Sequence, residues 1–169
     1  MDTYTLRQGT APLFISLPHN GTQVPDDIAA RLTPEARRVP DTDWHVAELY
    51  DFARALGASI IVPVYSRYVV DLNRPEDDVS LYPGQNTTGL CPIVRFSGDP
   101  VYLPGQDPAP DEIAARVDAY WRPYHQALQQ ELVRIREIHG RAVLWEGHSI
   151  RSKVPFLFEG RLPDFNLGT

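Results

Sequence analysis

The chain has 169 residues, of which 43% are hydrophobic and 22% are charged, a balance typical of one globular domain over residues 1–169. Its formal net charge is −6 and it has no run of basic residues, so nucleic acid is excluded as an expected partner. No apolar run approaches the roughly 20 residues that a membrane-spanning helix needs, so no membrane partner is expected either.

The single cysteine and the first residues of the chain both indicate the cellular compartment of the protein. The single cysteine, Cys91, cannot form a disulfide within the chain, which fits a reducing compartment. The N-terminal segment has an early acidic residue, Asp2, and lacks the apolar stretch of a secretory signal peptide. Together these features predict a cytoplasmic protein.

The first half of the chain predicts two buried strands separated by helical segments. Short apolar runs at residues 12–18 and 58–64 are typical of buried strands. A brief helical stretch is expected within residues 26–38. From residue 43 onward, apolar side chains repeat at intervals of three and four residues, which predicts an amphipathic helix that ends at Gly57.

The second half predicts two more strands around a long loop and a long helix. Residues 68–72 are expected to form a strand, and residues 76–110 are rich in proline and glycine. A loop of that length inside a domain is usually functional. A continuous apolar face predicts a helix over residues 111–139, followed by a strand at residues 141–145.

Alternating strands and helices predict an α/β fold in three layers, with a mostly parallel or mixed sheet and helices on both faces. In such sheets, ligands bind beyond the carboxyl ends of the strands. Three polar sites in the sequence directly follow predicted strands: His19, Asn73-Arg74 and His148. We therefore expect them at one edge of the sheet.

Two histidines at this edge, His19 and His148, are candidate metal ligands. Catalytic zinc sites usually combine three protein ligands, drawn from histidines and carboxylates, with a water molecule. The acidic segment at residues 41–45 can supply the third ligand, with Asp43 as the first candidate and His45 as the second. The alternative is that both histidines are only hydrogen-bonded residues at strand ends.

Arginines near the same edge are suited to binding a substrate carboxylate. A guanidinium group binds a carboxylate through two parallel hydrogen bonds, and a neighbouring asparagine adds a neutral donor. The alternative is that such an arginine pairs with Asp71 or Asp77 on the surface. The candidates for carboxylate binding are Arg67, Asn73, Arg74 and Arg151.

Five segments together resemble the N-formylglutamate amidohydrolase family, in an order and spacing that extend over nearly all of the chain. The set of five is much more specific than any one of them. The segments are Ser16-Leu17-Pro18-His19-Asn20-Gly21, Asp41-Thr42-Asp43-Trp44-His45-Val46, Ser66-Arg67-Tyr68-Val69-Val70-Asp71-Leu72-Asn73-Arg74-Pro75, Leu81-Tyr82-Pro83-Gly84-Gln85 and Gly147-His148-Ser149-Ile150-Arg151-Ser152.

This resemblance implies hydrolysis of N-formyl-L-glutamate to formate and L-glutamate, a step of histidine degradation, with a small acidic molecule as the substrate. It also implies a distant likeness to zinc carboxypeptidases, whose α/β sheet carries the metal at its strand ends. The residues that it implies are His19, Asp43 and His148 for the zinc ion, and Arg67, Asn73 and Arg74 for the substrate carboxylates.

The chain departs from the family pattern in two respects. Family members often have Asp-Ala-His-Ser where this chain has Glu146-Gly147-His148-Ser149. The family also continues well beyond residue 169, so we expect a sheet that is incomplete at its C-terminal end and a general base in the part that follows. Within this chain, Glu146 is the candidate base. An open sheet edge would favour association into a homo-oligomer.

Two other functions stay open at the level of sequence. The same fold could act on a different bond, as a metal-dependent peptidase or a cell-wall amidase, but the lack of a secretion signal favours the small acidic substrate. The other option is a binding module that holds a ligand or partner without turnover.

Overall fold

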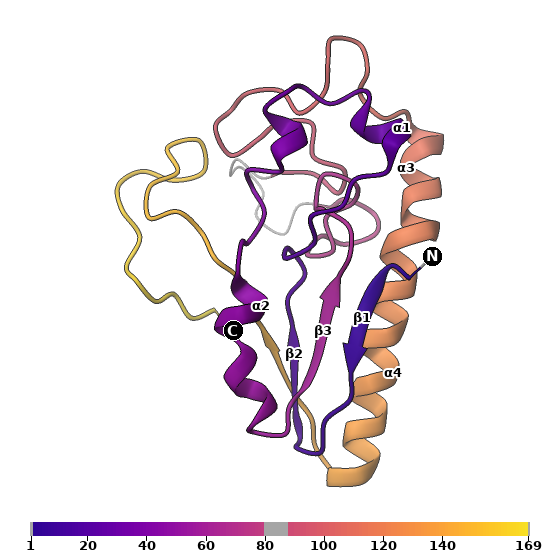
Figure 1. Cartoon of the computed structure of the whole chain (residues 1–169), viewed down its shortest axis with the longest axis vertical. Coiled ribbons are helices and arrows are strands. Elements are labelled where there is room, and N and C mark those ends of the chain that lie inside the picture. The colour runs from indigo at the N-terminus through magenta and orange to yellow at the C-terminus, as the bar shows by residue number, and fades with distance from the viewer. Residues whose placement is uncertain (1, 80–87, 169) are drawn as a thin grey trace.

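Four short strands form a mixed sheet at the centre of the structure, a computed structural model that describes residues 2–79 and 88–168 (Figure 1). β2 pairs in parallel with both β3 and β4, whereas β1 pairs antiparallel with β3. The three parallel strands therefore end at the same edge of the sheet. In the order in which they lie across the sheet, the strands are β1 (Tyr4–Arg7), β3 (Ser59–Pro63), β2 (Leu13–Ser16) and β4 (Val143–Glu146).

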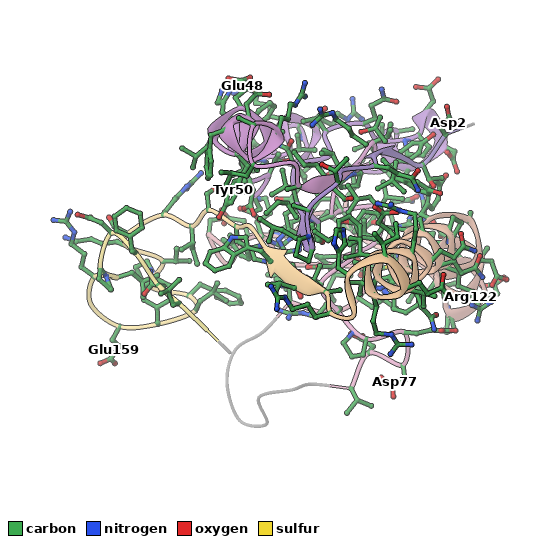
Figure 2. The ribbon with its side chains drawn as sticks, turned by 90° about the horizontal axis from the view of Figure 1, so that it is seen from below. Asp2, Glu48, Tyr50, Asp77, Arg122 and Glu159 are labelled. Atoms are coloured by element: carbon green, nitrogen blue, oxygen red, sulfur yellow. The ribbon has the colours of Figure 1, made fainter. Side chains whose placement is uncertain are left out.

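Helices cover both faces of this sheet, as Figure 2 shows from below. One face is covered by a long helical segment made of α3 (Pro110–Arg116), a π-helical turn η3 (Val117–Trp121) and α4 (Arg122–His139). The other face is covered by α2 (Val46–Leu49) and the 3-10 helix η2 (Asp51–Arg54). The predicted three-layer α/β fold with helices on both faces is confirmed.

Strand residues alternate between the two layers of helices, because successive side chains of a strand point to opposite faces. In β2, Phe14 is fully buried in the cluster that contains the long helical segment, whereas Ile15 packs in the cluster that contains Val46 and Ala53. Burying a side chain such as Phe14 contributes about 1.5–3 kcal/mol. Apolar character on both sides of β2 thus fixes it as an inner strand.

A third group of buried residues lies beyond the carboxyl ends of the strands. There, α1 (Asp26–Ala29) and η1 (Ala36–Arg38) pack in one cluster with the buried ring of Tyr68. Asp41 connects this cluster to the loop that contains Phe96. Its carboxylate accepts hydrogen bonds from the Tyr68 hydroxyl (2.7 Å) and the backbone N–H of Phe96 (2.9 Å). The loops at this edge are therefore held by buried contacts.

A buried ion pair fixes α4 at the opposite end of the sheet. The Glu131 side chain, only 2% exposed, accepts hydrogen bonds from Gln8 Nε2 (2.9 Å), from Arg134 Nε (2.8 Å) and from the Ser59 hydroxyl. Since Ser59 begins β3 and Gln8 follows β1, this pair lies at the end of the sheet away from the carboxyl ends of the parallel strands.

Most of the predicted elements are confirmed. β2, β3 and β4 lie within or next to the strands predicted at residues 12–18, 58–64 and 141–145. The helix predicted at residues 111–139 is present and ends at Gly140, whose φ of 72° is left-handed. Within the two described stretches of chain, no helix combines the length and the apolar character needed to cross a bilayer.

Three details differ from the sequence predictions. The helix predicted from residue 43 is broken into α2 and η2, and it cannot start before residue 46 because His45 takes a left-handed conformation with φ 64°. Residues 68–72, predicted as a strand, form a buried turn instead. The strand β1 was not predicted, because its side chains alternate between half-buried and exposed and carry no apolar run.

Candidate metal centre

His19 lies at the carboxyl end of the inner strand β2. The chain turns directly after the strand, where the backbone N–H of Asn20 donates to the carbonyl of Leu17 (3.2 Å). Gly21 then passes so close to the neighbouring loop that a Cβ at this position would lie 2.0 Å from the Tyr65 carbonyl oxygen. Only glycine permits this approach, and it places the His19 ring in the interior with 6% of the residue exposed.

Asp43 reaches the same place from the loop before α2. Its backbone N–H donates to the carbonyl of His19 (2.9 Å), and its own carbonyl accepts from the side-chain amide of Asn20 (2.9 Å). Two hydrogen bonds therefore tie this loop to the turn after β2. The Asp43 residue is 3% exposed.

His148 follows β4, the neighbour of β2 in the sheet. The backbone N–H of Gly147 donates to the carbonyl of Ser16 (2.9 Å), which extends the pairing of the two strands past their ends. A Cβ at position 147 would lie 2.7 Å from the side chain of Leu17 and 2.8 Å from that of Tyr50. The glycine thus lets β4 stay close to β2 and brings His148 beside His19.

The side chains of His19, Asp43 and His148 converge on one point. Oδ2 of Asp43 lies 3.2 Å from Nδ1 of His148 and 3.7 Å from Nδ1 of His19, and one ligand atom from each residue lies within 4.8 Å of the others. Two imidazole nitrogens and one carboxylate oxygen form a donor set that suits zinc. The residues present therefore fit a divalent metal ion.

His45, the second candidate for the third ligand, lies elsewhere. Its side chain is 73% exposed, and its Nδ1 is 3.2 Å from the carboxylate of Glu48. The left-handed backbone at His45 begins α2 and directs the following residues into the helix. Of the two candidates, the structure brings only Asp43 to the two histidines.

A buried carboxylate, Asp71, orients the first histidine. Nε2 of His19 donates to Oδ1 of Asp71 at 2.7 Å, so Nδ1 of the same ring is left to face Asp43. This pattern is typical of metal-binding histidines, whose second nitrogen usually donates to a carboxylate or a carbonyl. Asp71 is 0% exposed. From the sequence, this residue was expected only as a surface partner of an arginine.

The same carboxylate also holds Arg67. Nη2 of Arg67 donates to Oδ2 of Asp71 at 2.5 Å, and the backbone N–H of Asn73 donates to Oδ1 at 2.9 Å. Burial favours the protonated form of Asp71, but its interactions with the His19 ring and the Arg67 guanidinium outweigh it and hold the pKa of this carboxyl well below its usual range. The ion pair that the sequence allowed on the surface therefore exists, but in the interior.

His148 has more exposed surroundings. About a third of its side chain (32%) is exposed, and its Nε2 lies 3.3 Å from Oε1 of Glu146 and 3.2 Å from Nδ2 of Asn73. Burial favours the neutral ring, but the hydrogen bonds to Asp43 and Glu146 outweigh it and raise the pKa of His148 to about 9. The Asp43 carboxyl is affected in the opposite sense. Burial opposes its ionisation, but its hydrogen bonds to the two histidines hold its pKa at about 2.

A pocket of about 390 Å³ opens above the three converging side chains. Arg67 and Arg74 give its wall two positive charges. The guanidinium of Arg67 stacks 4.6 Å from the ring centroid of Phe96, and Nε of Arg74 donates to the Thr88 carbonyl at 2.8 Å. The apolar part of the wall consists of Phe96, Ile150, Leu157 and Phe158.

The other candidates for substrate binding lie around this pocket. Asn73 contacts His148 from the side. Arg151 lines a neighbouring hollow of about 270 Å³, which shares Asp43 and Ser149 with the main pocket and includes Trp44. The sequence segment Leu81–Gln85 lies outside the described residues.

Residues 11–169 match the family model described as N-formylglutamate amidohydrolase. The chain belongs to the N-formylglutamate amidohydrolase family. Within this member of the N-formylglutamate amidohydrolases, each of the four family segments that the structure describes contributes at least one side chain to the pocket. The resemblance seen in the sequence therefore corresponds to one place in the fold.

The chain is similar to two N-formylglutamate deformylases of pseudomonads. It is 53% identical over 165 residues to that of Pseudomonas putida, a match that covers 98% of this chain and 61% of the relative. The match to that of Pseudomonas aeruginosa is 51% identical over 168 residues and covers 99% of this chain and 63% of the relative. The chain thus spans about three-fifths of the length of these relatives.

Solved structures show a similar fold. A crystal structure of an N-formylglutamate amidohydrolase from Ralstonia eutropha superposes with a TM-score of 0.75 at 23% identity, over 90% of this chain and 59% of that one. A gene product of Agrobacterium tumefaciens gives a TM-score of 0.70 at 20% identity, over 94% of this chain and 61% of that one. At these identities the likeness concerns the fold alone.

Proposed function

We propose that this protein hydrolyses the formyl amide of N-formyl-L-glutamate to give formate and L-glutamate. The observation that supports it most directly is the convergence of His19, Asp43 and His148 on one point at the floor of a pocket that carries two arginines. The pseudomonad relatives, at 53% and 51% identity, are named for the same reaction. An acidic substrate is suited to this pocket, because its wall presents positive charge.

His19, Asp43 and His148 are the residues that would hold a divalent metal ion, and zinc suits their nitrogen and oxygen donors. Such an ion, when bound, supplies Lewis acidity to the formyl carbonyl and makes a water molecule more acidic. The chain itself holds the side chains of the proposed metal ligands in place before the ion binds. Asp71 holds the His19 ring, and Glu146 and Asn73 contact the outer edge of the His148 ring.

Arg74 and Arg67 are proposed to bind the carboxylates of the substrate, with Asn73 and Arg151 as further contacts at the rim. Arg74 donates from Nε to the Thr88 carbonyl (2.8 Å) and from Nη1 to the Asn73 carbonyl (3.3 Å). These bonds orient the guanidinium plane. A guanidinium that is already oriented loses less entropy when it binds a carboxylate, so much of its effect is on positioning.

Proton transfer is proposed for Glu146, the candidate base within the chain. Its carboxylate, 38% exposed in its side chain, lies 3.3 Å from His148 Nε2, on the edge of the ring opposite the nitrogen that faces Asp43. In this role it takes the proton of the attacking water and returns it to the departing amine. Glu146→Gln preserves the shape of the side chain and should lower kcat about 10²-fold or more if this assignment is right. If Glu146 only orients His148, the same variant will lose metal affinity and keep kcat in the metal-loaded form.

The test of the proposed function is a turnover assay with N-formyl-L-glutamate, run on protein whose metal content has been measured. We expect formate release that disappears after chelation and returns with zinc. A muropeptide fragment serves as the second substrate, because it separates this activity from that of a cell-wall amidase. Metal-loaded protein that binds L-glutamate without turning over either substrate would contradict the proposal and favour a binding module.

Arg74→Ala tests the carboxylate contact. Loss of a hydrogen-bonded charge should raise KM by about 10- to 100-fold while kcat changes less, since the interaction is made in the ground state as well as in the transition state. Arg141→Ala is the matched control, because Arg141 is exposed and lies outside the pocket. An unchanged KM in the Arg74 variant would remove Arg74 from the binding site.

A further inference from the structure

The long helical segment widens where it passes the Asn73-Arg74 turn. The π-helical turn η3 ends at Trp121, and Pro123 stands at the second position of α4. Proline has no N–H to donate and its ring displaces the carbonyl four residues earlier, which interrupts the regular helix at this point. π-Helical turns inside long helices frequently occur at functional sites.

Two side chains from this widened region hold the Asn73-Arg74 turn. The indole N–H of Trp121 donates to the carbonyl of Arg74 at 2.9 Å. Nε2 of His125 lies 3.0 Å from the carbonyl of Leu72. The two acceptors flank Asn73 in the chain, so the helix grips the backbone on both sides of this residue.

The two rings also support one another. Trp121 and His125 stack with ring centroids 3.8 Å apart and an interplanar angle of 25°. Burial lowers the pKa of His125, so the ring is neutral at pH 7, and the tautomer with its proton on Nε2 donates to the Leu72 carbonyl. A stacked pair with two fixed hydrogen bonds is a more rigid support than either side chain alone.

The turn depends on such support, because residues 71–75 belong to no strand or helix. The carbonyls of Asp71 and Pro75 accept backbone N–H groups from nearby residues, whereas those of Leu72 and Arg74 are bonded by the side chains of His125 and Trp121. Neither Trp121 nor His125 is among the described residues that line the pocket. Their effect on the site acts through the turn.

We propose that Trp121 and His125 are positioning residues that hold the Asn73-Arg74 turn in the geometry needed to bind a substrate carboxylate. This inference rests on the proposed function, since it concerns the same pocket. It adds a role for the junction between η3, which ends at Trp121, and α4, which contains His125, because both rings reach carbonyls of the turn from there. Substrate affinity therefore depends in part on Trp121 and His125, which contact the turn from outside the pocket.

The experiment compares Trp121→Phe and His125→Phe, each of which keeps a ring for stacking and removes one hydrogen bond. Each variant should raise KM for N-formyl-L-glutamate by about fivefold, with kcat and zinc content unchanged. The dissociation constant for L-glutamate, measured by calorimetry, should rise by the same factor. His125→Gln keeps an N–H donor at the end of the side chain and should recover most of the affinity.

A double-mutant cycle with Arg74→Ala distinguishes positioning from general stabilisation. If Trp121 acts through the turn, Trp121→Phe will raise KM in the wild-type background and will add nothing in the Arg74→Ala background. If Trp121 only stabilises the fold, its effect will be the same in both backgrounds and will appear as a lower active fraction with KM unchanged. That second pattern would overturn the inference.

Gln126→Ala is the control variant on the same helix, because Gln126 is exposed next to His125. It should leave KM and glutamate affinity unchanged. Absence of turnover in the wild-type protein would contradict the proposed function. Wild-type turnover together with normal KM values in both ring variants would contradict only the positioning role.

Discussion

Two buried carboxylates, Asp71 and Glu131, lie at opposite ends of the sheet. They differ in whether the side chains that bond them also face a pocket. At the amino-terminal end of β3, Glu131 is bonded by Gln8, Arg134 and Ser59. At the other end, Asp71 is bonded by the side chains of His19 and Arg67. Both groups are nearly inaccessible to solvent, at 2% and 0% exposure. By burial and pairing alone, they would look alike.

The difference lies in what the partners do with their other atoms. Around Glu131 the remaining donors bond to the protein itself, as when Arg134 Nη2 donates to the carbonyl of Gly9 (3.1 Å). Around Asp71, His19 turns Nδ1 towards Asp43, and both His19 and Arg67 line an open pocket. A buried ion pair therefore indicates a site only where its partners keep atoms directed into accessible space.

The largest effect is expected from removing one of these partners at the pocket end. His19→Ala deletes a proposed ligand and should abolish stoichiometric zinc binding and turnover together. Arg134→Ala, at the other end, should leave zinc binding intact and lower the free energy of unfolding by about 3 kcal/mol, because Glu131 is left buried without its counter-charge. Metal analysis by mass spectrometry and chemical denaturation provide the two measurements. Full zinc content in the His19 variant would defeat the ligand assignment.

Changing the carboxylates themselves should give a smaller but more informative difference. Asp71→Asn leaves Arg67 buried without its counter-charge and should lower the free energy of unfolding by about 3 kcal/mol. It should also weaken zinc binding by about 10- to 100-fold, because His19 loses its orienting acceptor. Glu131→Gln should destabilise the fold by about 2 kcal/mol and leave zinc affinity unchanged. Equal zinc affinities in the two variants would show that the two ends do not differ in this way.

The pH dependence of zinc uptake should follow His148. Asp43 and Glu146 raise its pKa to about 9, so at neutral pH the ring carries a proton that an entering ion must displace. Affinity should therefore rise by about tenfold per pH unit between pH 6 and 8 and level off above about pH 9. Competition titrations at several pH values measure this slope. An affinity independent of pH would show that His148 does not have to lose a proton.

The smallest effect is expected at His45, whose side chain is mostly exposed and pairs with Glu48. His45→Ala should change zinc affinity by no more than about twofold, as for a surface substitution. Asp43→Asn in the same loop should remove most of the affinity, because Asp43 lies between the two histidines. The reverse order of effects would make His45 the third ligand.

Much of the fold could be predicted because its inner strands are apolar on both sides. β2 and β3 carry continuous apolar runs, so their positions follow from burial alone. Residues 68–72 have the same apolar character, yet they form a buried turn: Tyr68 and Val69 pack against α1 and η1, whereas Val70 and Leu72 pack in the cluster of the long helical segment. A short apolar run predicts that a segment is buried, but it does not predict that its backbone pairs with a neighbouring strand. The strand prediction at residues 68–72 was wrong for this reason.

Only the part of the candidate site that lies at the ends of predicted strands could be predicted from the sequence. His19 and His148 were expected at one edge, and they meet because β4 pairs directly with β2. Asp71 and the stacked pair of Trp121 and His125 were not predicted, because their partners lie far away in sequence and depend on the tertiary fold. In the sequence, Asp71 lies inside a predicted strand, and only its position two residues before Asn73 sets it apart from other acidic residues.

Asp71 also imposes a thermodynamic linkage on the pocket. A single carboxylate accepts hydrogen bonds from a proposed metal ligand, His19, and from a proposed carboxylate-binding residue, Arg67. Whatever factor the ion adds to the affinity for the dicarboxylate, the dicarboxylate must add to the affinity for the ion. Metal binding and substrate binding are then coupled through Asp71, a carboxylate that would contact neither the ion nor the substrate.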